Sequence, residues 1–389
     1  MIGIIGAGPA GSYYSSIDNS DDKIIFEAKK EIGKPIACTG ILTHSINDVL
    51  NMKKLKKEDP NIITSKLKKF IIIAPNGESI TIKQKQPDYI VNRTLFDQYI
   101  ANLAIENNTK IKLNEKVLGY KKINKSTYKL KTSKSSYEVN TIVAADGPNS
   151  IIARQNNLLI NRKYARGWQI RCKYPNIEDG TTIVHLGNGA FSWITPESDK
   201  IARVGIIGED TNSMKKAYKI LKNKSIKILE NQSGPVPYYS KKFPLQQKTI
   251  VNNNHNISKN SFLNKTTKEN IFYIGDAAGM IKSTTYGGII YGLEAGKLLA
   301  KNKNTYEKEF HKQFNKELIT SNIIRKLLDN VSKKDANQLV NIFKKEKKRQ
   351  FLGSIDRNYP SKFLCPLLLN NPKLIPFGIK MAFKTLWKR

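Results

Sequence analysis

The chain has 389 residues, of which 39% are hydrophobic and 25% are charged. This composition supports folded domains with a sizeable core and excludes low-complexity and intrinsically disordered classes. The 66 Lys and Arg residues outnumber the 32 Asp and Glu residues, and the formal net charge of +34 favours nucleic acid, anionic lipid or acidic proteins as partners. Because no nucleic-acid-binding motif accompanies the charge, we expect no nucleic acid among the partners.

The amino terminus predicts a strand, a glycine turn and a helix. Residues 2–5 are apolar, and Gly6, Gly8 and Gly11 follow in the motif GAGPAG before a helix-compatible run. The first glycine permits a tight turn, the second lets the backbone approach a pyrophosphate, and the third allows the helix to pack on the strand. Since the start of that helix offers free N–H groups to an anion, the motif predicts a bound nucleotide.

A second apolar strand, at residues 23–26, ends at Glu27. An acidic side chain roughly 20 residues into such a unit accepts hydrogen bonds from an adenosine ribose. The same carboxylate disfavours a 2′-phosphate, so the predicted nucleotide lacks one.

The cysteines and the first residues bear on location and metal binding. Cys38, Cys172 and Cys365 are far apart and lack the paired spacing of a zinc site or a dithiol motif. We therefore expect no metal and no disulfide. The amino terminus also lacks the basic segment and cleavage motif of a secretory signal, which predicts a cytoplasmic protein.

The middle of the chain predicts an antiparallel sheet. Residues 69–74 and 79–83 flank Asn76 and Gly77, a strong hairpin signal. Further strands alternate or run apolar between turn residues, at residues 181–186, 190–194 and 201–207.

Two charged or polar stretches follow. Residues 246–270 are rich in Gln, Asn, Lys, Thr and Ser, and we expect a mobile loop there. Residues 305–350 predict one or two charged helices. Their apolar residues are spaced to form a packing stripe, consisting of Phe310, Phe314, Ile319, Ile323, Leu327, Leu328 and Val331.

A second ligand-binding segment lies between these stretches. Residues 270–274 read as a buried strand that leads into Gly275 and Asp276, and Gly288 precedes an apolar, helix-length run from Ile289. Asp276 can accept hydrogen bonds from ribityl hydroxyls, and the N–H groups at the helix start can face a pyrophosphate or the electron-rich edge of an isoalloxazine ring. Together with the amino-terminal motif, this segment favours a flavin nucleotide over a nicotinamide nucleotide.

The carboxyl end mixes apolar side chains with lysines over residues 363–369 and 374–389, with Trp387 near its end. No apolar run reaches the roughly 20 residues that a membrane span needs. A basic amphipathic helix of this kind lies in the headgroup layer of an anionic membrane or docks on the core of its own protein. The sequence leaves both interpretations open.

The motifs together resemble those of the geranylgeranyl reductase family, within the glutathione-reductase-like and hydroxylase-like FAD superfamily. Five stretches carry the resemblance: residues 6–27, 34–40, 91–97, 144–150 and 275–296. It implies an α/β fold with a Rossmann-like FAD-binding lobe of the glutathione reductase and p-hydroxybenzoate hydroxylase type, an antiparallel-sheet substrate lobe and a C-terminal helical region. The implied ranges are 1–60, 90–160 and 270–300 for the FAD-binding domain, 61–89 and 161–269 for the substrate domain, and 301–389 for the helical region.

The resemblance also implies which residues bind FAD. Cys38 and Thr39 match positions beside the isoalloxazine ring, whereas Ser283 and Tyr286 stand where the family usually has Pro and Gly. Because a Tyr lacks the access of Gly to positive φ, a different turn or a compensated strain is expected at Tyr286. The remaining implied contacts are Gly6, Gly8, Ala10 and Gly11 at the pyrophosphate, Glu27 at the ribose, Arg93 near the phosphates, Val117 at the adenine, and Asp276, Gly288 and Ile289 near the ribityl chain and ring.

The reaction implied by the resemblance is the reduction of isolated C=C bonds in geranylgeranyl chains of membrane lipids or their precursors, by hydride from FAD and a proton. An unactivated alkene has no carbonyl to polarise, so the site must position it, exclude water and supply an acid. Cys38 is expected to be the proton donor or to tune the flavin, with a structural role as the alternative. Phe191, Trp193 and Pro196 match part of a family signature and are expected to wall an apolar tunnel, with ordinary sheet packing as the alternative.

The expected partners are a polyprenyl lipid, an electron donor and a membrane surface. Because the sequence has one dinucleotide motif and no convincing second nucleotide lobe, we expect a small reductase or ferredoxin as the donor rather than tightly bound NADPH. An acidic electron carrier suits a basic protein. Peripheral contact with an anionic membrane is also expected. Two alternatives stay open: an FAD-dependent monooxygenase or halogenase of the same superfamily, and a non-catalytic, flavin-binding, membrane-associated protein.

Overall fold

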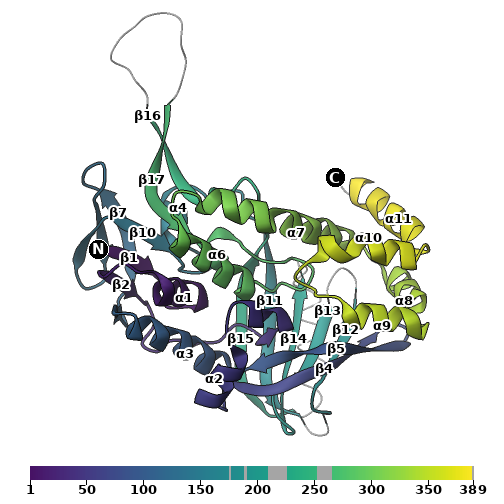
Figure 1. Cartoon of the computed structure of the whole chain (residues 1–389). Coiled ribbons are helices and arrows are strands. Elements are labelled where there is room, and N and C mark those ends of the chain that lie inside the picture. Colours follow the sequence, from purple (N-terminus) through teal and green to yellow (C-terminus); the bar gives the residue numbers. More distant parts are fainter. Residues whose placement is uncertain (175–176, 188–190, 209–225, 252–264, 388–389) are drawn as a thin grey trace, which may run out of the picture.

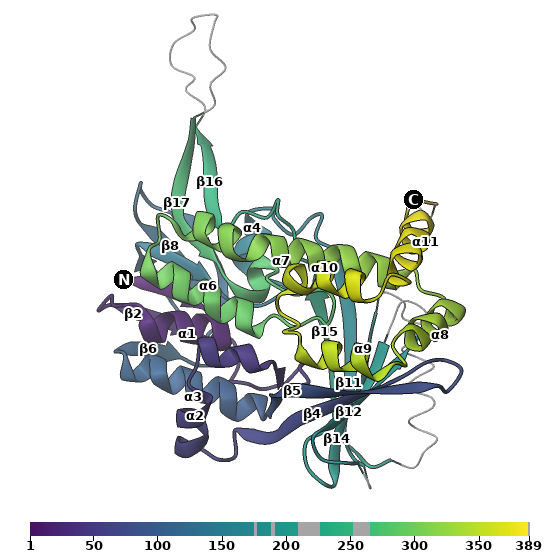
Figure 2. The ribbon, with the colours of Figure 1, turned by 45° about the vertical axis from the view of Figure 1, so that its right-hand side comes forward.

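The structure of the protein is a computed structural model that describes residues 1–174, 177–187, 191–208, 226–251 and 265–387. Within these residues the strands form three sheets, with helices beside and between them (Figures 1 and 2). The α/β fold class predicted from the sequence is confirmed.

A six-stranded sheet is built around the amino-terminal strand. Its order is β16-β17-β10-β1-β2-β6, and every neighbouring pair is parallel except β16 and β17. β1, β2 and β10 are buried along their whole length, as expected for parallel strands covered on both faces. The strands are Ile2–Ile5 (β1), Lys23–Phe26 (β2), Thr109–Lys112 (β6), Thr141–Ala144 (β10), Gln246–Val251 (β16) and Lys265–Tyr273 (β17).

Different elements cover the two faces of this sheet. An added Cβ on Gly3 would meet Leu130 and Val139 of a three-stranded sheet, whereas one on Gly11 of α1 would meet Ile4. Since successive strand residues point to opposite faces, the helices lie on one side and the small sheet on the other. The helices are Pro9–Ile17 (α1), Arg93–Glu106 (α3) and Ile289–Lys301 (α6), and the small sheet has Val117–Lys122 (β7), Tyr128–Thr132 (β8) and Ser136–Val139 (β9).

The second large sheet has eight strands in the order β15-β11-β14-β13-β12-β4-β5-β3. The predicted hairpin is confirmed and is longer than expected, with Gly77 at φ +87° in its turn. One expectation was wrong: β12 pairs with β4 in parallel, so the sheet is mixed rather than wholly antiparallel. The strands are Ile41–Leu42 (β3), Ile63–Ile73 (β4), Ser79–Val91 (β5), Tyr164–Lys173 (β11), Thr181–Leu186 (β12), Phe191–Pro196 (β13), Ile201–Gly208 (β14) and Ile228–Pro237 (β15).

Short helices join these sheets. They are the 3-10 helices His44–Asp48 (η1) and Gly275–Ala278 (η2) and the α-helices Met52–Glu58 (α2) and Ile151–Gln155 (α4). Asn51 caps α2 and Ser150 caps α4 through side-chain oxygens that accept backbone N–H groups, which is the usual way in which short helices begin.

The prediction of a mobile loop over residues 246–270 was wrong at both of its ends. β16 and β17 form an antiparallel ribbon that extends from the six-stranded sheet (Figure 1), and residues 252–264 between them lie outside the described part of the chain. Backbone pairing offsets the polar composition, and Glu269 anchors the ribbon by accepting hydrogen bonds from Lys122 and Tyr128. The ribbon belongs to the six-stranded sheet, although its residues fall mostly in the range predicted for the substrate domain.

Residues 305–354 form three helices rather than one or two. Ser332 and Asp335 make a capping box that starts a new helix after α7. Phe310 and Phe314 are buried as predicted, but Ile323 is 54% exposed and Leu318 is buried nearby instead. The helices are Tyr306–Asp329 (α7), Lys333–Ile342 (α8) and Glu346–Ser354 (α9).

The carboxyl end forms α10 (Pro360–Asn370) and α11 (Leu374–Trp387). The docking interpretation is confirmed for one face of α11, which is buried at Leu374, Phe377 and Met381. Another face is open to solvent, and its contact with a membrane stays a prediction. The open face, which we term the exposed stripe, consists of Ile375, Ile379 and Phe383, at 48, 54 and 61% exposure. No helix in the described residues has both the length and the hydropathy to cross a bilayer.

Candidate functional site

The glycine turn after β1 leaves the start of α1 open to a ligand. Gly6 has φ +98°, and a Cβ added to it would lie 2.5 Å from the Ala145 carbonyl oxygen. A Cβ added to Gly11 would lie 2.3 Å from the Gly6 carbonyl oxygen, whereas one added to Gly8 meets no atom within 4 Å. Gly8 is also the N-cap of α1, where no described side chain caps the helix. In the described residues, nothing therefore fills the space beside Gly8, and the backbone N–H groups at a helix start favour an anion such as a diphosphate.

Glu27 stands beside this turn at the end of β2. Its Oε2 accepts the Ala7 N–H over 2.8 Å, and its Oε1 accepts the Lys29 N–H over 2.9 Å. A carboxylate has about four lone-pair sites, so Glu27 keeps acceptor capacity for ribose hydroxyls. The Glu27 carbonyl accepts the Glu115 N–H, which brings the start of β7 at Val117 to the same edge of the sheet.

The two predicted ends of the site meet in space. A Cβ added to Gly275, in η2, would lie 2.9 Å from the Cβ of Ala10 in the amino-terminal motif. One added to Gly288 would lie 3.1 Å from Oδ1 of Asp276, and α6 begins at Ile289 directly after it. Residues more than 260 positions apart in the sequence therefore form one site, which we term the cradle. It consists of glycine backbone, the Asp276 carboxylate and the starts of α1 and α6.

Charged groups converge on this cradle. Burial raises the pKa of Asp276, and the nearby Arg93 and Arg162 oppose that rise. Among the described residues, the Asp276 carboxylate accepts no hydrogen bond, so its oxygens are available to a hydroxyl-bearing ligand. Burial lowers the pKa of Arg93, but Asp97 and Cys38 outweigh this effect and raise it. Arg93 donates to Asp97 from Nε and Nη2, each over 2.9 Å, and retains further N–H donors.

The loop that carries Cys38 and Thr39 is fixed to the eight-stranded sheet. Gln169 Nε2 donates to the Cys38 carbonyl over 2.9 Å, and Thr39 Oγ1 donates to Gln169 Oε1 over 3.0 Å. Arg203 Nη1 donates to the carbonyl oxygens of Cys38 and Thr39, over 3.2 and 2.8 Å. The thiol itself accepts the Gly40 N–H over 3.4 Å. The sheet thus presents this loop to the cradle.

Sequence reasoning missed the residues that hold this loop. Arg203 is 2% exposed and pairs with Glu197 over 3.1 Å, while Arg171 pairs with the same carboxylate over 2.7 Å. Burial raises the pKa of Glu197, but the two arginines outweigh it and lower that pKa overall. The sequence signal for this pair was Arg203, a charged residue inside the apolar run of β14. A buried charge needs a partner of opposite charge nearby.

The predicted aromatic residues share one face of β13. The ring centroids of Phe191 and Trp193 are 5.9 Å apart, as expected for alternate strand residues. The indole lies against the backbone of Gly205, where an added Cβ would be 2.3 Å from Trp193 Cζ2. In the described residues, Trp193 Nε1 is buried without a hydrogen-bond acceptor. Pro196 ends the strand opposite Ala202.

Tyr286, which stands where the family usually has a glycine, adopts a left-handed backbone conformation. Its φ is +55°, which is uncommon for a bulky residue. Its ring stacks with Phe191 at 6.3 Å and contacts Tyr238, whose hydroxyl lies 3.0 Å from that of Tyr286. These contacts support the ring of Tyr286, and they join its loop to Phe191 and Trp193, which we term the aromatic wall. Ser283, the other departure, donates to Asn322.

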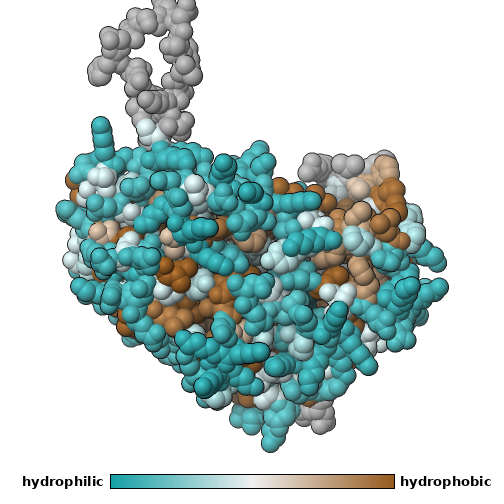
Figure 3. Space-filling model, viewed as in Figure 1, coloured by the Kyte–Doolittle hydropathy of each residue, from teal (hydrophilic) through white to brown (hydrophobic). Residues whose placement is uncertain are grey.

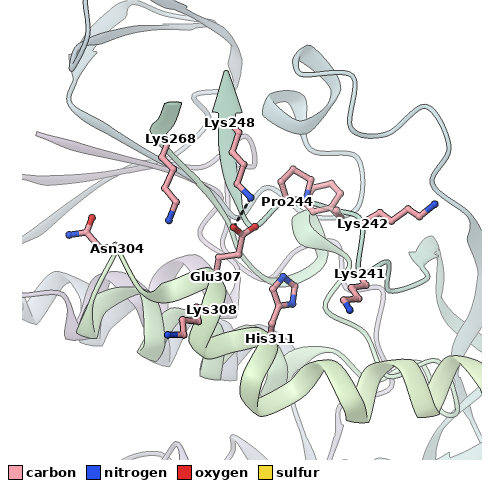
Figure 4. Close-up of a pocket in the computed structure, with 10 residues that line it drawn as sticks. Lys241, Lys242, Pro244, Lys248, Lys268, Asn304, Glu307, Lys308 and His311 are labelled. Atoms are coloured by element: carbon pink, nitrogen blue, oxygen red, sulfur yellow. Dashed lines mark ion pairs between the residues drawn. The ribbon is translucent and has the colours of Figure 1, made fainter. Parts of the chain in front are cut away.

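A surface hollow of about 360 Å³ lies outside this cradle, between the base of the β16–β17 ribbon and α7 (Figure 4). Its one carboxylate, Glu307, pairs with Lys248 over 3.0 Å. Phe243 separates the hollow from Arg162, which lies 4.3 Å above its ring and donates to the backbone of η2. The lining residues are Lys241, Lys242, Phe243, Pro244, Lys248, Lys268, Asn304, Glu307, Lys308 and His311.

Known proteins resemble this chain in sequence and in fold. No family model matches the chain. A digeranylgeranylglycerophospholipid reductase of Methanococcus vannielii is 26% identical over an alignment of 343 positions that covers 80% of each chain.

Solved structures share the fold over nearly the whole chain. A geranylgeranyl bacteriochlorophyll reductase-like protein from Thermoplasma acidophilum has a TM-score of 0.78 at 20% identity and covers 98% of both chains. The flavin-dependent halogenase CmlS has a TM-score of 0.66 at 14% identity and covers 95% of this chain and 76% of its own. The chain therefore shares its fold with these two proteins, and it resembles the geranylgeranyl reductase family, as its motifs indicate.

Proposed function

We propose that the protein is an FAD-dependent reductase that saturates isolated C=C bonds of geranylgeranyl chains in membrane lipids or their precursors. The observation that carries the proposal is the cradle formed where Ala10 meets Gly275, with Tyr286 of the loop before α6 stacked on Phe191. The reductase name of the relative supports this choice over a monooxygenase or halogenase, since the halogenase shares the fold at lower similarity.

The residues present fit FAD. The start of α1 and Arg93 would hold the diphosphate, Glu27 the adenosine ribose with Val117 beside the adenine, and Asp276 the ribityl chain. The N–H groups at Gly288 and Ile289 would face the ring. When bound, FAD supplies the hydride that an unactivated alkene needs.

The remaining residues would bind and protonate the alkene. Phe191 and Trp193 offer apolar rings to an isoprenoid chain and keep water from it. Cys38, on the loop that Gln169 and Arg203 fix, would donate the proton or tune the flavin. A Cys38→Ser variant with full alkene reduction removes Cys38 from catalysis.

An anaerobic turnover experiment tests the function. The purified protein with FAD is reduced by light and then mixed with a geranylgeranyl glycerophospholipid without oxygen. Flavin reoxidation and a lipid mass that rises by two hydrogens per double bond support the reductase. A product that forms only with oxygen and carries a hydroxyl or halogen supports the alternative, and flavin without any turnover supports a non-catalytic role.

We also propose an acidic electron carrier, such as ferredoxin, as the reductant. The net charge of +34 and the lysine-lined hollow of Figure 4 support this partner. The ring of Phe243, in the lining of the hollow, contacts the guanidinium of Arg162, which donates to the backbone of η2. Lys268→Glu with Lys308→Glu should slow flavin reduction by ferredoxin about tenfold at low salt, while Lys53→Glu on α2 should not. Equal rates for all three proteins would remove the hollow as the docking site.

A membrane contact through α11 is the third part of the proposal. Figure 3 shows hydrophobic residues gathered at the upper right, in the region of α10 and α11, and exposed Leu369 on α10 adds to the exposed stripe of α11. Lys380 and Lys384 do not face lipid freely, because both pair with Asp335 over 2.5 Å.

Vesicle flotation tests this contact. Ile379→Glu with Phe383→Glu should reduce binding to anionic vesicles at least about tenfold. Ile160→Glu, at a residue that is 74% exposed elsewhere, is the matched control. Point variants are preferable to truncation because Leu374, Phe377 and Met381 belong to the core.

A further inference from the structure

The loop between η2 and α6 contains an almost fully buried lysine. Lys282 is 2% exposed, and its backbone N–H donates to the Gly287 carbonyl over 3.0 Å. Its Nζ lies 4.0 Å from the position of a Cβ added to Gly287. The ammonium therefore sits directly behind the Gly287–Gly288 turn that precedes α6, on the segment proposed to face the flavin ring.

The surroundings of this ammonium satisfy it only in part. Nζ donates to Asn358 Oδ1 over 2.7 Å, and in the described residues Lys282 has no ion pair within 4 Å and no second hydrogen bond. Asn358 is held for this contact, since its Nδ2 donates to Thr43 and Ser45 and its carbonyl accepts the Tyr291 hydroxyl. An ammonium has three donors and is costly to bury. A neutral hydrogen-bond donor could make the same link to Asn358, so the link alone does not account for a lysine here.

Charged groups around the loop tune this lysine. Burial, the largest effect, and Arg357 lower the pKa of Lys282 to about 7, while Asp356 and Asp88 oppose them. Arg357 is itself paired with Asp88, and His44 lies 3.7 Å from Asp88 and 3.9 Å from Asp356. The lysine therefore gains or loses its charge close to neutral pH.

We propose that the buried charge of Lys282 raises the reduction potential of the flavin held at the Gly287–Gly288 turn. The inference rests on the FAD binding proposed above and deepens it. Reduction brings two electrons from the donor and one proton from solvent to the ring, which leaves one negative charge on it. A cation behind the turn stabilises that charge, adding to the start of α6. Where Lys282 is neutral, it takes a second proton from solvent as the ring is reduced.

Two measurements on the FAD-loaded protein test this role. Sulfite adds to the flavin ring and leaves a negative charge there, so its affinity reports the same stabilisation without turnover. Lys282→Gln keeps a donor for Asn358 but removes the charge, and it should weaken sulfite binding at pH 6 at least about tenfold. Asn358→Ala removes the link but keeps the charge, and it should bind sulfite nearly as the wild type does.

The pH dependence of the midpoint potential is the second measurement, and it needs no variant. Below pH 7 the wild-type slope should correspond to one proton per two electrons, and above pH 7 to two. A plot of midpoint potential against pH that is straight, with the slope for one proton per two electrons throughout, overturns the role of Lys282. So does a Lys282→Gln protein that binds FAD and keeps wild-type affinity for sulfite. A colourless protein that refuses FAD overturns the proposed function instead.

Discussion

The contact between Trp193 and Gly205 allows one prediction to be worked through. A Cβ at residue 205 would lie 2.3 Å from Cζ2 and 2.6 Å from Cε2 of the indole, and 2.7 Å from the Cβ of Gln169. Since carbon atoms pack at about 3.5–4.0 Å, Gly205→Ala must displace the indole by about 1 Å. Overpacking of this kind costs about 1–3 kcal/mol of stability, and a 1 Å misplacement at a reacting site costs roughly 100-fold in rate.

The assay compares urea unfolding, FAD content and kcat/KM for the lipid in three proteins. Gly205→Ala should retain FAD, lose about 1–3 kcal/mol and lose roughly 100-fold in kcat/KM. Gly167→Ala, on β11 of the same sheet, is the control because its added Cβ would meet atoms only from 3.6 Å outward. Adding Trp193→Phe to Gly205→Ala should recover stability by shrinking the ring. Wild-type stability and rate in Gly205→Ala would show that the indole is not held against this backbone.

Three further predictions concern buried charge, pH and backbone strain. Arg203→Met leaves Glu197 with one partner fewer and should lower the free energy of unfolding by about 3 kcal/mol in urea; a loss below about 1 kcal/mol contradicts the buried pair. Burial raises the pKa of Asp335, but its two lysine partners and its cap outweigh this and hold it below its usual value. The carboxylate therefore stabilises the fold above about pH 4 and loses that effect as the pH falls. Asp335→Asn should cost about 1 kcal/mol at pH 7, with the difference from wild type shrinking in acid, and a constant difference contradicts this. Tyr286→Ala should be about 1 kcal/mol less stable than Tyr286→Gly, because both lose the ring but only Gly relieves the positive φ; equal stabilities refute the strain.

The sequence predicted correctly the features that neighbouring residues determine. The glycine turn before α1, the strand that ends at Glu27 and the hairpin at Gly77 follow from neighbouring residues and were predicted correctly. The alternate spacing of Phe191 and Trp193 likewise placed both rings on one face. Which FAD atoms these residues contact stays a prediction.

Long-range contacts could not be predicted in the same way. The parallel pairing of β12 with β4 and the ribbon of β16 and β17 depend on partners distant in the chain, and polar composition alone suggested a loop. Arg203, Gln169 and Lys282 acquire their roles from Cys38, Thr39 and Asn358, which lie 76 to 165 positions away. A different turn or a compensated strain was expected at Tyr286, and the sequence did not show that Phe191 and Tyr238 would contact its ring.

The meeting of Ala10 with Gly275 has a consequence for how the protein is made. During synthesis the first strand leaves the ribosome long before β17, its neighbour but one in the sheet, has been translated. Until then β10 presents an unpaired edge, which is a hazard for aggregation of a nascent chain. The proposed FAD site includes Gly288 and the start of α6, so a pulse-labelled ribosome-bound chain should acquire protease resistance from added FAD only after α6 has emerged.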